Sequence, residues 1–282
     1  MISAVTRRAR RKLLRTVRNS GLYVRHRSTA RNLYHCGLPR SGSQWIRGVL
    51  RDEAVYRYSG LTYYNYLTRY PDGVDPRRLT ERYETEPFPP GRIASPLYLD
   101  FNSFESIPKP PDYRAIFVFR DPRDVLTSWY FSMRKSHELM GRVGDWRAEL
   151  QRLPKDEGLL YSISIMDRDV GIFDAMRSWM DAPDRDPNVY LVAFEELSGP
   201  AAYEAFRQVF QHCDVPLPAR ALQRLIDRHS FATKSGRRQG VEDRTSQMRK
   251  GVAGDWVNHL DDRAVSELQA VAGDLITGFG YE

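Results

Sequence analysis

Residues 32–51 read NLYHCGLPRSGSQWIRGVLR, a run in which a short apolar segment meets a loop with two glycines. Residues 32–36 predict a buried strand, residues 37–43 a loop, and residues 44–51 the start of a helix. Such a turn leaves backbone N–H groups without partners at the helix start, where the helix dipole adds positive potential. It therefore predicts an anion site, with N–H donors from the residues after the cation Arg40, namely Ser41, Gly42, Ser43 and Gln44.

A second informative segment is the apolar run Tyr-Arg-Ala-Ile-Phe-Val-Phe at residues 113–119. Prolines precede it and Arg120-Asp121-Pro122 follows it, as expected for a central parallel strand that leads into a helix. Ligands of open α/β sheets bind at the carboxyl ends of the strands. Arg120 stands at that end and Ser128 lies about two turns into the helix, so the pair predicts a phosphate site.

Arg249-Lys250-Gly251 forms a third segment, beside a polar stretch at residues 233–249 that is rich in Gly, Ser and Arg. Neighbouring arginine and lysine side chains can surround one phosphate from two sides. Alone the tripeptide means little, because charged pairs are common on surfaces. With the other two segments it predicts a site for a nucleotide that carries two separate anionic groups.

Another strand is predicted at residues 189–194, and a helix follows at residues 201–210. Because strand, loop and helix recur, we expect an α/β fold: a single domain with a central parallel sheet flanked by helices and a P-loop-like strand-loop-helix phosphate site. Residues 32–282 would form this domain and residues 1–31 a basic N-terminal tail. The stretches 52–112 and 132–171 are less regular.

The net charge of +7 is concentrated in the predicted tail. Residues 1–31 contain ten arginines and lysines and no acid, which leaves the remainder at −3. The tail is interpreted as a solvated leader or as a short helix on an anionic membrane surface, with Leu13, Leu14 and Val17 as its apolar strip. Nucleic-acid binding is disfavoured, because aromatic and basic residues are not interleaved for base stacking.

Cys36 and Cys213 are the only cysteines, too few for a disulfide framework and typical of small core residues in a reducing cytosol. No Cys/His cluster has zinc spacing, so no metal site is predicted. No apolar run of about 18 residues predicts a membrane span, and no apolar stretch follows the charged start as in a secretory signal. We expect a cytoplasmic protein, with peripheral membrane contact through the tail as a variant of this hypothesis.

The first loop differs from the phosphate loop of nucleoside triphosphatases. Gly37 and Gly42 have the right interval, but that motif needs Lys and then Ser or Thr next, for the phosphates and Mg²⁺. Here Ser43 and Gln44 follow, and the cation, Arg40, precedes the second glycine. Metal-dependent triphosphate chemistry is therefore disfavoured.

Together the three segments resemble the cytosolic-type sulfotransferase family, which uses 3′-phosphoadenosine 5′-phosphosulfate (PAPS) as donor. Residues 39–45 are similar to its 5′-sulfophosphate loop, residues 120–128 to its 3′-phosphate segment, and residues 249–254 to its late Arg-Lys-Gly-x-x-Gly element. The resemblance covers roughly residues 32–282. It implies a PAPS-dependent sulfotransferase with 3′,5′-adenosine bisphosphate (PAP) as product and no metal.

Carried over by position, the resemblance implies a role for each matching residue. Arg40 would contact the transferring sulfuryl group, and the 5′-phosphate would be held by Ser41, Gly42, Ser43 and Gln44. Trp45 and Phe231 would stack on adenine, while Phe194 stands where the family usually has tyrosine. The 3′-phosphate would be held by Arg120, Ser128, Arg249 and Lys250, with Gly251 as their flexible neighbour.

The chain departs from the family where the acceptor is deprotonated. Many members have a Thr-His pair there, and the corresponding residues 92–100 contain no histidine. A carboxylate would then serve as base: Asp100 and Glu105 are the nearest candidates, and His137 is a third. A helix cap or a surface position would also explain each of them.

The acceptor is left open by these motifs. The tyrosine-rich residues 52–70 and Trp129-Tyr130-Phe131 favour an aromatic-lined pocket. Sulfuryl transfer to a hydroxyl or amine of a small molecule, lipid or sugar is the leading hypothesis. The alternatives are a nucleotide-binding module of the same fold without catalysis and a P-loop kinase.

Overall fold

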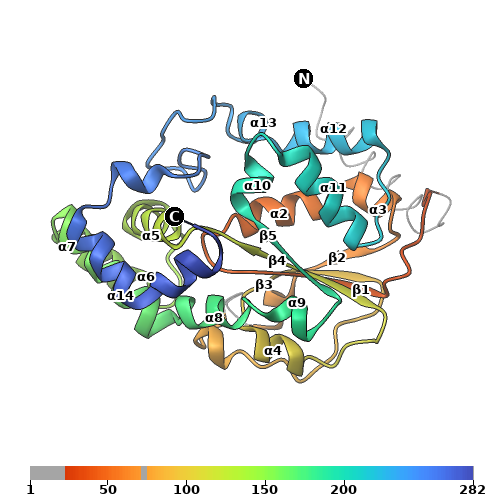
Figure 1. Ribbon diagram of the computed structural model, residues 1–282, viewed down its shortest axis with the longest axis horizontal. Coiled ribbons are helices and arrows are strands. Elements are labelled where there is room, and N and C mark those ends of the chain that lie inside the picture. Colours follow the sequence, from red (N-terminus) through yellow and green to blue (C-terminus); the bar gives the residue numbers. More distant parts are fainter. Residues whose placement is uncertain (1–22, 71–74, 282) are drawn as a thin grey trace.

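The computed structural model describes residues 23–70 and 75–281, which are built around a five-stranded sheet (Figure 1). All neighbouring strands are parallel, in the order β2-β3-β1-β4-β5. The strands are β1 (Asn32–Gly37), β2 (Thr62–Tyr64), β3 (Arg92–Leu97), β4 (Tyr113–Phe119) and β5 (Val189–Ala193). The predicted α/β class and the strands predicted at 32–36, 113–119 and 189–194 are confirmed. Because β1 and β4 are parallel neighbours, the loop after β1 and the segment that begins at Arg120 after β4 leave the same edge of the sheet.

Successive residues of the strands pack on opposite faces of the sheet, and each face has its own core. Tyr34 and Phe117 belong to one cluster of buried residues. Leu33 and Ile116 belong to the other. This period of two follows from the pleat of the strand. Long apolar runs such as that in β4 are therefore buried on both sides, which is typical of a central parallel strand.

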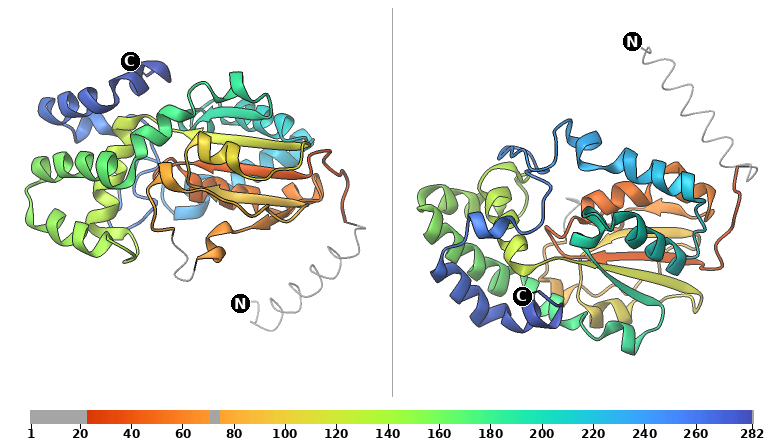
Figure 2. Two further views of the ribbon diagram at one scale, coloured as in Figure 1. Left: turned by 90° about the horizontal axis from the view of Figure 1, so that it is seen from below. Right: turned by 45° about the horizontal axis from the view of Figure 1, so that its top comes forward.

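Helices cover both faces and gather beyond the carboxyl ends of the strands (Figures 1 and 2). Above the sheet in Figure 1 lie α2 (Ser43–Leu50), α3 (Glu53–Arg57), α10 (Phe194–Ser198), α11 (Ala202–His212), α12 (Ala219–His229) and α13 (Phe231–Ser235). Below it lie α4 (Phe101–Ser106), α8 (Ile172–Ser178) and α9 (Ala182–Arg185).

A separate helical group at the left of Figure 1 consists of α5 (Pro122–Phe131), α6 (Val143–Arg152), α7 (Lys155–Ser164) and α14 (Asp262–Gly278). Two π-helical turns, η3 (Ser132–Ser136) and η4 (Ile165–Val170), extend α5 and α7. Three short 3₁₀ turns are η1 (Tyr66–Arg69), η2 (Leu79–Glu81) and η5 (Asp255–Asn258). The segment between α13 and η5 crosses from the upper helices to this group, past the carboxyl ends of the strands (Figure 2).

The sequence pattern missed β2 and β3. β3 carries Arg92 at its start and Pro96 near its end, which break the apolar run that marked the other strands. Its place between β2 and β1 buries it all the same. Pairing with two neighbours overrides weak local preference here, as is common for strands.

Residues 23–31, which were assigned to the basic tail, pack on the domain where the structure describes them. The N–H of Arg25 donates to the carbonyl of Arg57 at 2.7 Å. The N–H and hydroxyl of Thr29 donate to the carboxylate of Asp214 at 2.5 and 2.8 Å. The rest of the predicted tail, including its apolar strip, lies outside the described residues.

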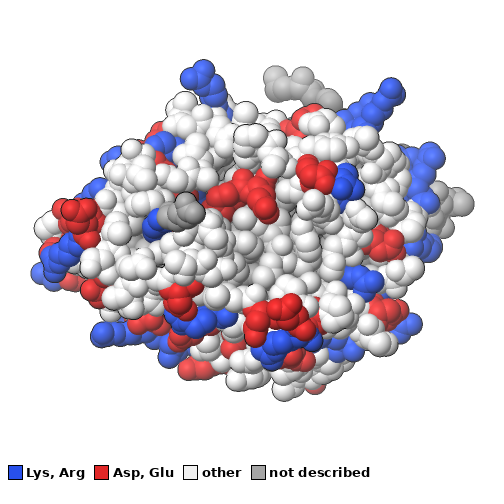
Figure 3. Space-filling model, in the orientation of Figure 1, with Lys and Arg blue, Asp and Glu red and all other residues white. Residues whose placement is uncertain are grey.

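Charged side chains of both signs are scattered over the face seen in Figure 3, with no continuous basic area on that face. Among residues 23–70 and 75–281, none of the helices combines the length and apolarity that a bilayer crossing needs.

Candidate active site

The loop between β1 and α2 presents open hydrogen-bond donors at the start of a helix. Gly42 is the N-cap of α2 with φ of 80°, a left-handed conformation that glycine adopts without strain. Within the described part of the chain, the N–H groups of Gly42, Ser43 and Gln44 have no hydrogen-bond acceptor. Open donors and a helix dipole are the features that the anion site predicted at this turn would need.

Three side chains hold this loop in shape. The Ser41 hydroxyl donates to the carbonyl of Leu38 at 2.7 Å and is buried, so it closes the loop on itself. Ser43 shares a hydrogen bond of 2.8 Å with the hydroxyl of Tyr98, to which the Gln44 amide donates at 2.9 Å. Tyr98 directly follows β3, so the loop is braced from the neighbouring strand.

Arg40 connects the loop to α5 and to the late segment. Its Nε donates to the hydroxyl of Ser128 at 3.1 Å and its Nη2 to the carbonyl of Gln247 at 3.4 Å. Burial, with the nearby charges of Arg120 and Arg249, lowers the pKa of Arg40 to about 10. The guanidinium therefore stays charged at neutral pH and lies among the other cations that the sequence singled out.

Arg120 lies beside Arg40 at the carboxyl end of β4. Its Nη1 donates to the carbonyl of Arg40 at 3.3 Å, and its guanidinium carbon lies 4.4 Å from the centre of the Phe194 ring. Its Nε is buried without a hydrogen-bond partner, since the Glu195 carboxylate lies 3.9 Å from it, beyond hydrogen-bond distance. A buried guanidinium N–H without a partner is costly, so this atom fits an anionic ligand.

Arg249 and Lys250 reach the same region from the far end of the chain. Both donate to the buried carboxylate of Asp255, at 2.6 and 2.5 Å. Arg249 also lies 4.6 Å from the ring centre of Phe131 on α5. Burial by itself would raise the pKa of the Asp255 carboxyl. The hydrogen bonds from its two cationic partners outweigh this effect and hold the pKa well below the ordinary value.

The three aromatic residues predicted to contact the base surround the start of α2. The indole N–H of Trp45 donates to the carbonyl of His229 at 2.7 Å, and its ring meets Phe194 edge-on at 5.8 Å. Phe231 packs against Gly251, where an added Cβ would overlap its ring. Phe194 is buried, and its ring packs against Gly42 and Arg120. It therefore supports the loop from below.

The two carboxylates predicted as bases have structural partners. Asp100 is the N-cap of α4, is buried, and accepts the N–H of Ser103 at 2.7 Å. Glu105 forms an ion pair with Arg185, which precedes β5. That contact lies at the amino ends of the strands, opposite to Arg40. These placements argue against a catalytic role for either carboxylate, because a base must come within hydrogen-bond reach of the acceptor.

His137, the third candidate, follows the π-helical turn at the end of α5. Its Nδ1 lies 2.9 Å from the carbonyl oxygen of Glu138. A carbonyl only accepts, so Nδ1 carries the proton and Nε2 of the neutral ring keeps its lone pair. Burial, with the charges of Arg40 and Arg147, lowers the pKa of His137, which keeps the ring neutral at pH 7.

Sequence reasoning missed several residues that complete the site, among them Tyr98, Asp124 and Asp255. Tyr98 lies within the stretch that was searched for a histidine, and its hydroxyl contacts the loop. Asp124 accepts N–H groups from Gly254 and Trp256. These contacts of Asp124 span at least 130 positions and leave no spacing signal in a single sequence.

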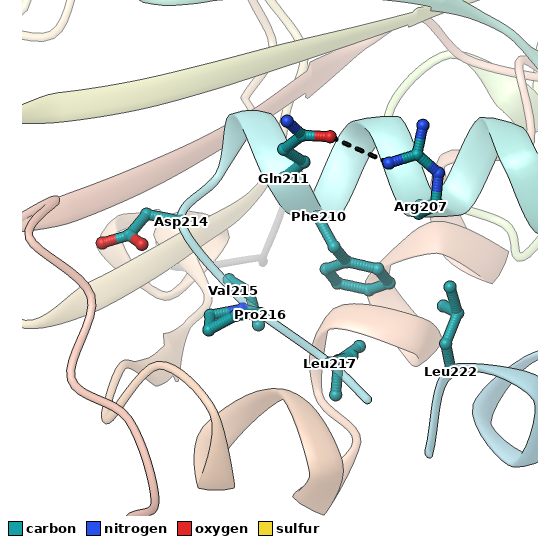
Figure 4. Close-up of a pocket in the computed structure, with 8 residues that line it drawn as sticks. All are labelled: Arg207, Phe210, Gln211, Asp214, Val215, Pro216, Leu217 and Leu222. Carbon is teal, nitrogen blue, oxygen red and sulfur yellow. Dashed lines mark hydrogen bonds between the residues drawn. The ribbon is translucent and has the colours of Figure 1, made fainter. Parts of the chain in front are cut away.

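Two further features bear on binding. Within the described ranges no group of three or more His, Cys, Asp or Glu residues could hold a metal ion. A pocket of about 230 Å³ lies between α11 and α12 and is lined in part by Phe210, Val215 and Leu222 (Figure 4). His212 of α11 binds the carbonyl of Asn188 just before β5, so this pocket lies toward the amino ends of the strands, away from Arg40.

Comparison with known proteins agrees with this geometry. The chain is 25% identical over 156 residues to Sulfotransferase 2A1 of Homo sapiens, over 52% of this chain and 50% of that protein. It is 23% identical over 195 residues to Sulfotransferase 6B1 of Danio rerio, over 67% of this chain and 60% of that protein. The matches thus span about half the length of these relatives, or slightly more.

Solved structures share the fold over most of the chain. Mouse sulfotransferase SULT7A1 complexed with PAP matches with a TM-score of 0.61 at 17% identity, over 92% of this chain and 91% of that chain. Retinol dehydratase in a complex with retinol and PAP matches with a TM-score of 0.53 at 17% identity, over 89% and 82%. The profile of the sulfotransferase domain matches residues 33–280. The chain, with its phosphate loop, its parallel sheet and its late cationic segment, therefore belongs to the sulfotransferase family.

Proposed function

We propose that this protein is a sulfotransferase that moves a sulfuryl group from PAPS to a hydroxyl or amine acceptor and releases PAP. The observation that carries the proposal is the pair of anion sites at one edge of the sheet. One consists of the open N–H groups at the start of α2. The other is formed by Arg120 and Ser128, with Arg249 and Lys250 close by. A nucleotide with a 5′-phosphosulfate and a 3′-phosphate carries one anionic group for each of these two sets of donors.

The residue roles follow from these contacts. The N–H groups of Gly42, Ser43 and Gln44 would hold the 5′-phosphate, and Ser41 would keep the loop closed. The 3′-phosphate would take the free Nε of Arg120 and the hydroxyl of Ser128. Trp45 and Phe231 would face adenine, with Gly251 leaving room for the Phe231 ring. Arg249 and Lys250 would add charge from the Asp255 side.

Catalysis would consist mainly of positioning and charge stabilisation. PAPS supplies the activated sulfuryl group, and by analogy with phosphoryl transfer its in-line transfer builds charge on oxygens at both sides of the sulfur. Arg40 is a fixed cation between the loop and Ser128, where it can stabilise that charge. Since fixed cations take the place of a metal, the proposed reaction is metal-independent.

His137 is the proposed base in place of Asp100 and Glu105, because both carboxylates already have structural partners. Its tautomer leaves Nε2 free to accept a proton, and the charge of Arg40 acts on the ring. A base of this kind accepts the proton of the acceptor hydroxyl as sulfur–oxygen bond formation proceeds.

The His137→Gln protein is expected to transfer sulfate about a hundredfold more slowly at pH 7, because general bases contribute roughly 10²–10⁴-fold. In the wild type, kcat/KM should be level at neutral pH and fall as the pH drops through the lowered pKa of His137, where the ring gains a proton. The variant should lose this acidic limb. An acidic limb that persists unchanged in the variant would exclude His137 as the base.

The acceptor and the location are proposed as classes. Retinol and androsterone occur in complexes of retinol dehydratase, a protein of the same fold. We propose a hydroxylated small molecule, lipid or sugar as acceptor, and a cytoplasmic location with peripheral contact to anionic membranes through the arginine-rich tail. Nucleic acid is not proposed as a partner.

PAP is expected to raise the melting temperature of the protein by several degrees, whereas 5′-AMP and Mg-ATP should have little effect. A ligand that binds the native state at a hundred times its Kd stabilises it by about 2.7 kcal/mol. Only PAP carries both anionic groups that the two sites would take. Equal shifts with PAP and 5′-AMP would remove the 3′-phosphate site, and selective stabilisation by Mg-ATP would instead support a kinase.

A further inference from the structure

Asp124 in the first turn of α5 holds together parts of the site that are far apart in the chain. Its carboxylate accepts the N–H of Gly254 at 2.7 Å and the N–H of Trp256 at 3.1 Å. The same carboxylate accepts Nη2 of Arg120 at 3.3 Å. Asp124 is only 1% exposed, so these donors and the start of the helix offset the cost of burying its charge.

Neighbouring contacts fix the same segment to the same turn. Arg120 Nη2 also donates to the carbonyl of Val252 at 3.3 Å. The guanidinium of Arg123 lies over the Trp256 ring, 4.2 Å from its centre. Residues 252–256 are thus attached to the start of α5 and to Arg120 by backbone hydrogen bonds and by the contact of the Arg123 guanidinium with the Trp256 ring.

This attachment decides where the late cations lie. Arg249 and Lys250 both bind Asp255, which stands between the two N–H groups that Asp124 accepts. The position of residues 254–256 therefore helps to fix these two cations, together with the contact of Arg249 with Phe131 on α5. Without the Asp124 carboxylate, two backbone donors and one guanidinium lose a charged acceptor, and the segment loses its hold on α5.

We propose that Asp124 is a positioning residue of the anion site: by clamping residues 252–256 to α5 it aligns Arg120 and brings Arg249 and Lys250 to the same anion. The inference rests on the proposed function, in that the anion is the 3′-phosphate of the nucleotide. It assigns Asp124 no contact with the nucleotide and no part in the chemical step. Its effect is therefore on affinity for ligands with a 3′-phosphate.

The test compares two ligands in the full-length chain. Asp124→Asn keeps the shape of the side chain but removes its charge, so Kd for PAP is expected to rise about ten- to hundredfold, as for lost hydrogen bonds to a charged group. Kd for 5′-AMP, which lacks the 3′-phosphate, should stay within about twofold, because its proposed contacts are with the loop at the start of α2 and with the adenine-facing residues Trp45 and Phe231. Isothermal titration calorimetry measures both values.

Asp184→Asn is the matched control, since it makes the same chemical change at an exposed position of α9, away from the site. It should leave both affinities unchanged. Trp256→Leu is the second variant, because it loosens the same attachment without altering α5. It should show the same selective loss of PAP affinity, and it decides the question if Asp124→Asn does not fold.

Each outcome separates the two proposals. Selective loss of PAP affinity in either variant supports the positioning role. Unchanged PAP affinity, or equal loss for PAP and 5′-AMP, overturns it, because Asp124 would then be dispensable or would support the fold in general. If the wild type itself fails to prefer PAP over 5′-AMP, the proposed function fails first, whatever the variants do.

Discussion

Replacement of Arg40 by alanine is expected to lower the rate of sulfuryl transfer about a hundredfold or more while the protein keeps its fold. The guanidinium lies between the phosphate loop and Ser128, and its pKa of about 10 keeps it charged at neutral pH. Loss of one preorganised donor to a developing anion costs on the order of 3 kcal/mol in the transition state. Single-turnover rates with PAPS and a phenol acceptor measure the loss.

The Arg40→Lys protein is the matched control for this result. Lysine keeps the charge but offers no planar fork, so it cannot donate to Ser128 and to the carbonyl of Gln247 in the same way. We expect activity between those of the wild type and the alanine variant, with melting temperatures alike in all three. Near wild-type turnover in Arg40→Ala would contradict the assignment of Arg40 as the charge-stabilising residue.

Gly42→Ala is expected to weaken PAP binding about tenfold or more and to lower the melting temperature. At φ of 80° the left-handed backbone conformation destabilises an alanine by roughly 1–2 kcal/mol. Its Cβ would also lie 2.5 Å from the Phe194 ring, so either the ring or the loop must move. Either movement redirects the N–H groups at the start of α2, which are the donors proposed for the 5′-phosphate.

Gly91→Ala isolates the conformational cost from the clash. Gly91 has φ of 73°, but an added Cβ there meets nothing within 4 Å. The free energy of unfolding of this variant should fall by a similar amount, owing to the left-handed backbone conformation alone. Its affinity for PAP should stay unchanged. Calorimetry and thermal melts on both proteins separate the two effects. Wild-type PAP affinity in Gly42→Ala would show that the loop donors do not hold the nucleotide.

The parts of the fold that were predicted are those with strong local patterns. β4 carries an uninterrupted apolar run at residues 115–119, and the turn after β1 contains a helix start with Gly42 at its N-cap. Both follow from spacing over a few residues. β3 was not predicted, because Arg92 and Pro96 interrupt its pattern and its stability comes from its neighbouring strands and the surrounding core.

The candidate base shows the limit of reasoning from position alone. Asp100 and Glu105 were chosen for their nearness in sequence to the family's histidine. The structure shows that Asp100 caps α4 and that Glu105 pairs with Arg185 at the other edge of the sheet. His137 follows a π-helical turn, whose irregular rise hides the direction of its side chain from a helical count.

By itself the sequence determined the α/β class, the order of the three anion segments and the cations they carry. These are properties of local hydrogen bonding and of side-chain period, which act over a few residues. Only the tertiary structure decided which distant groups of the chain meet at the site. Asp124 meets Gly254 across 130 positions of the chain, and Arg40 meets Ser128 across 88. Such pairs depend on how the sheet places the ends of its strands, and strand order follows from packing of the whole chain.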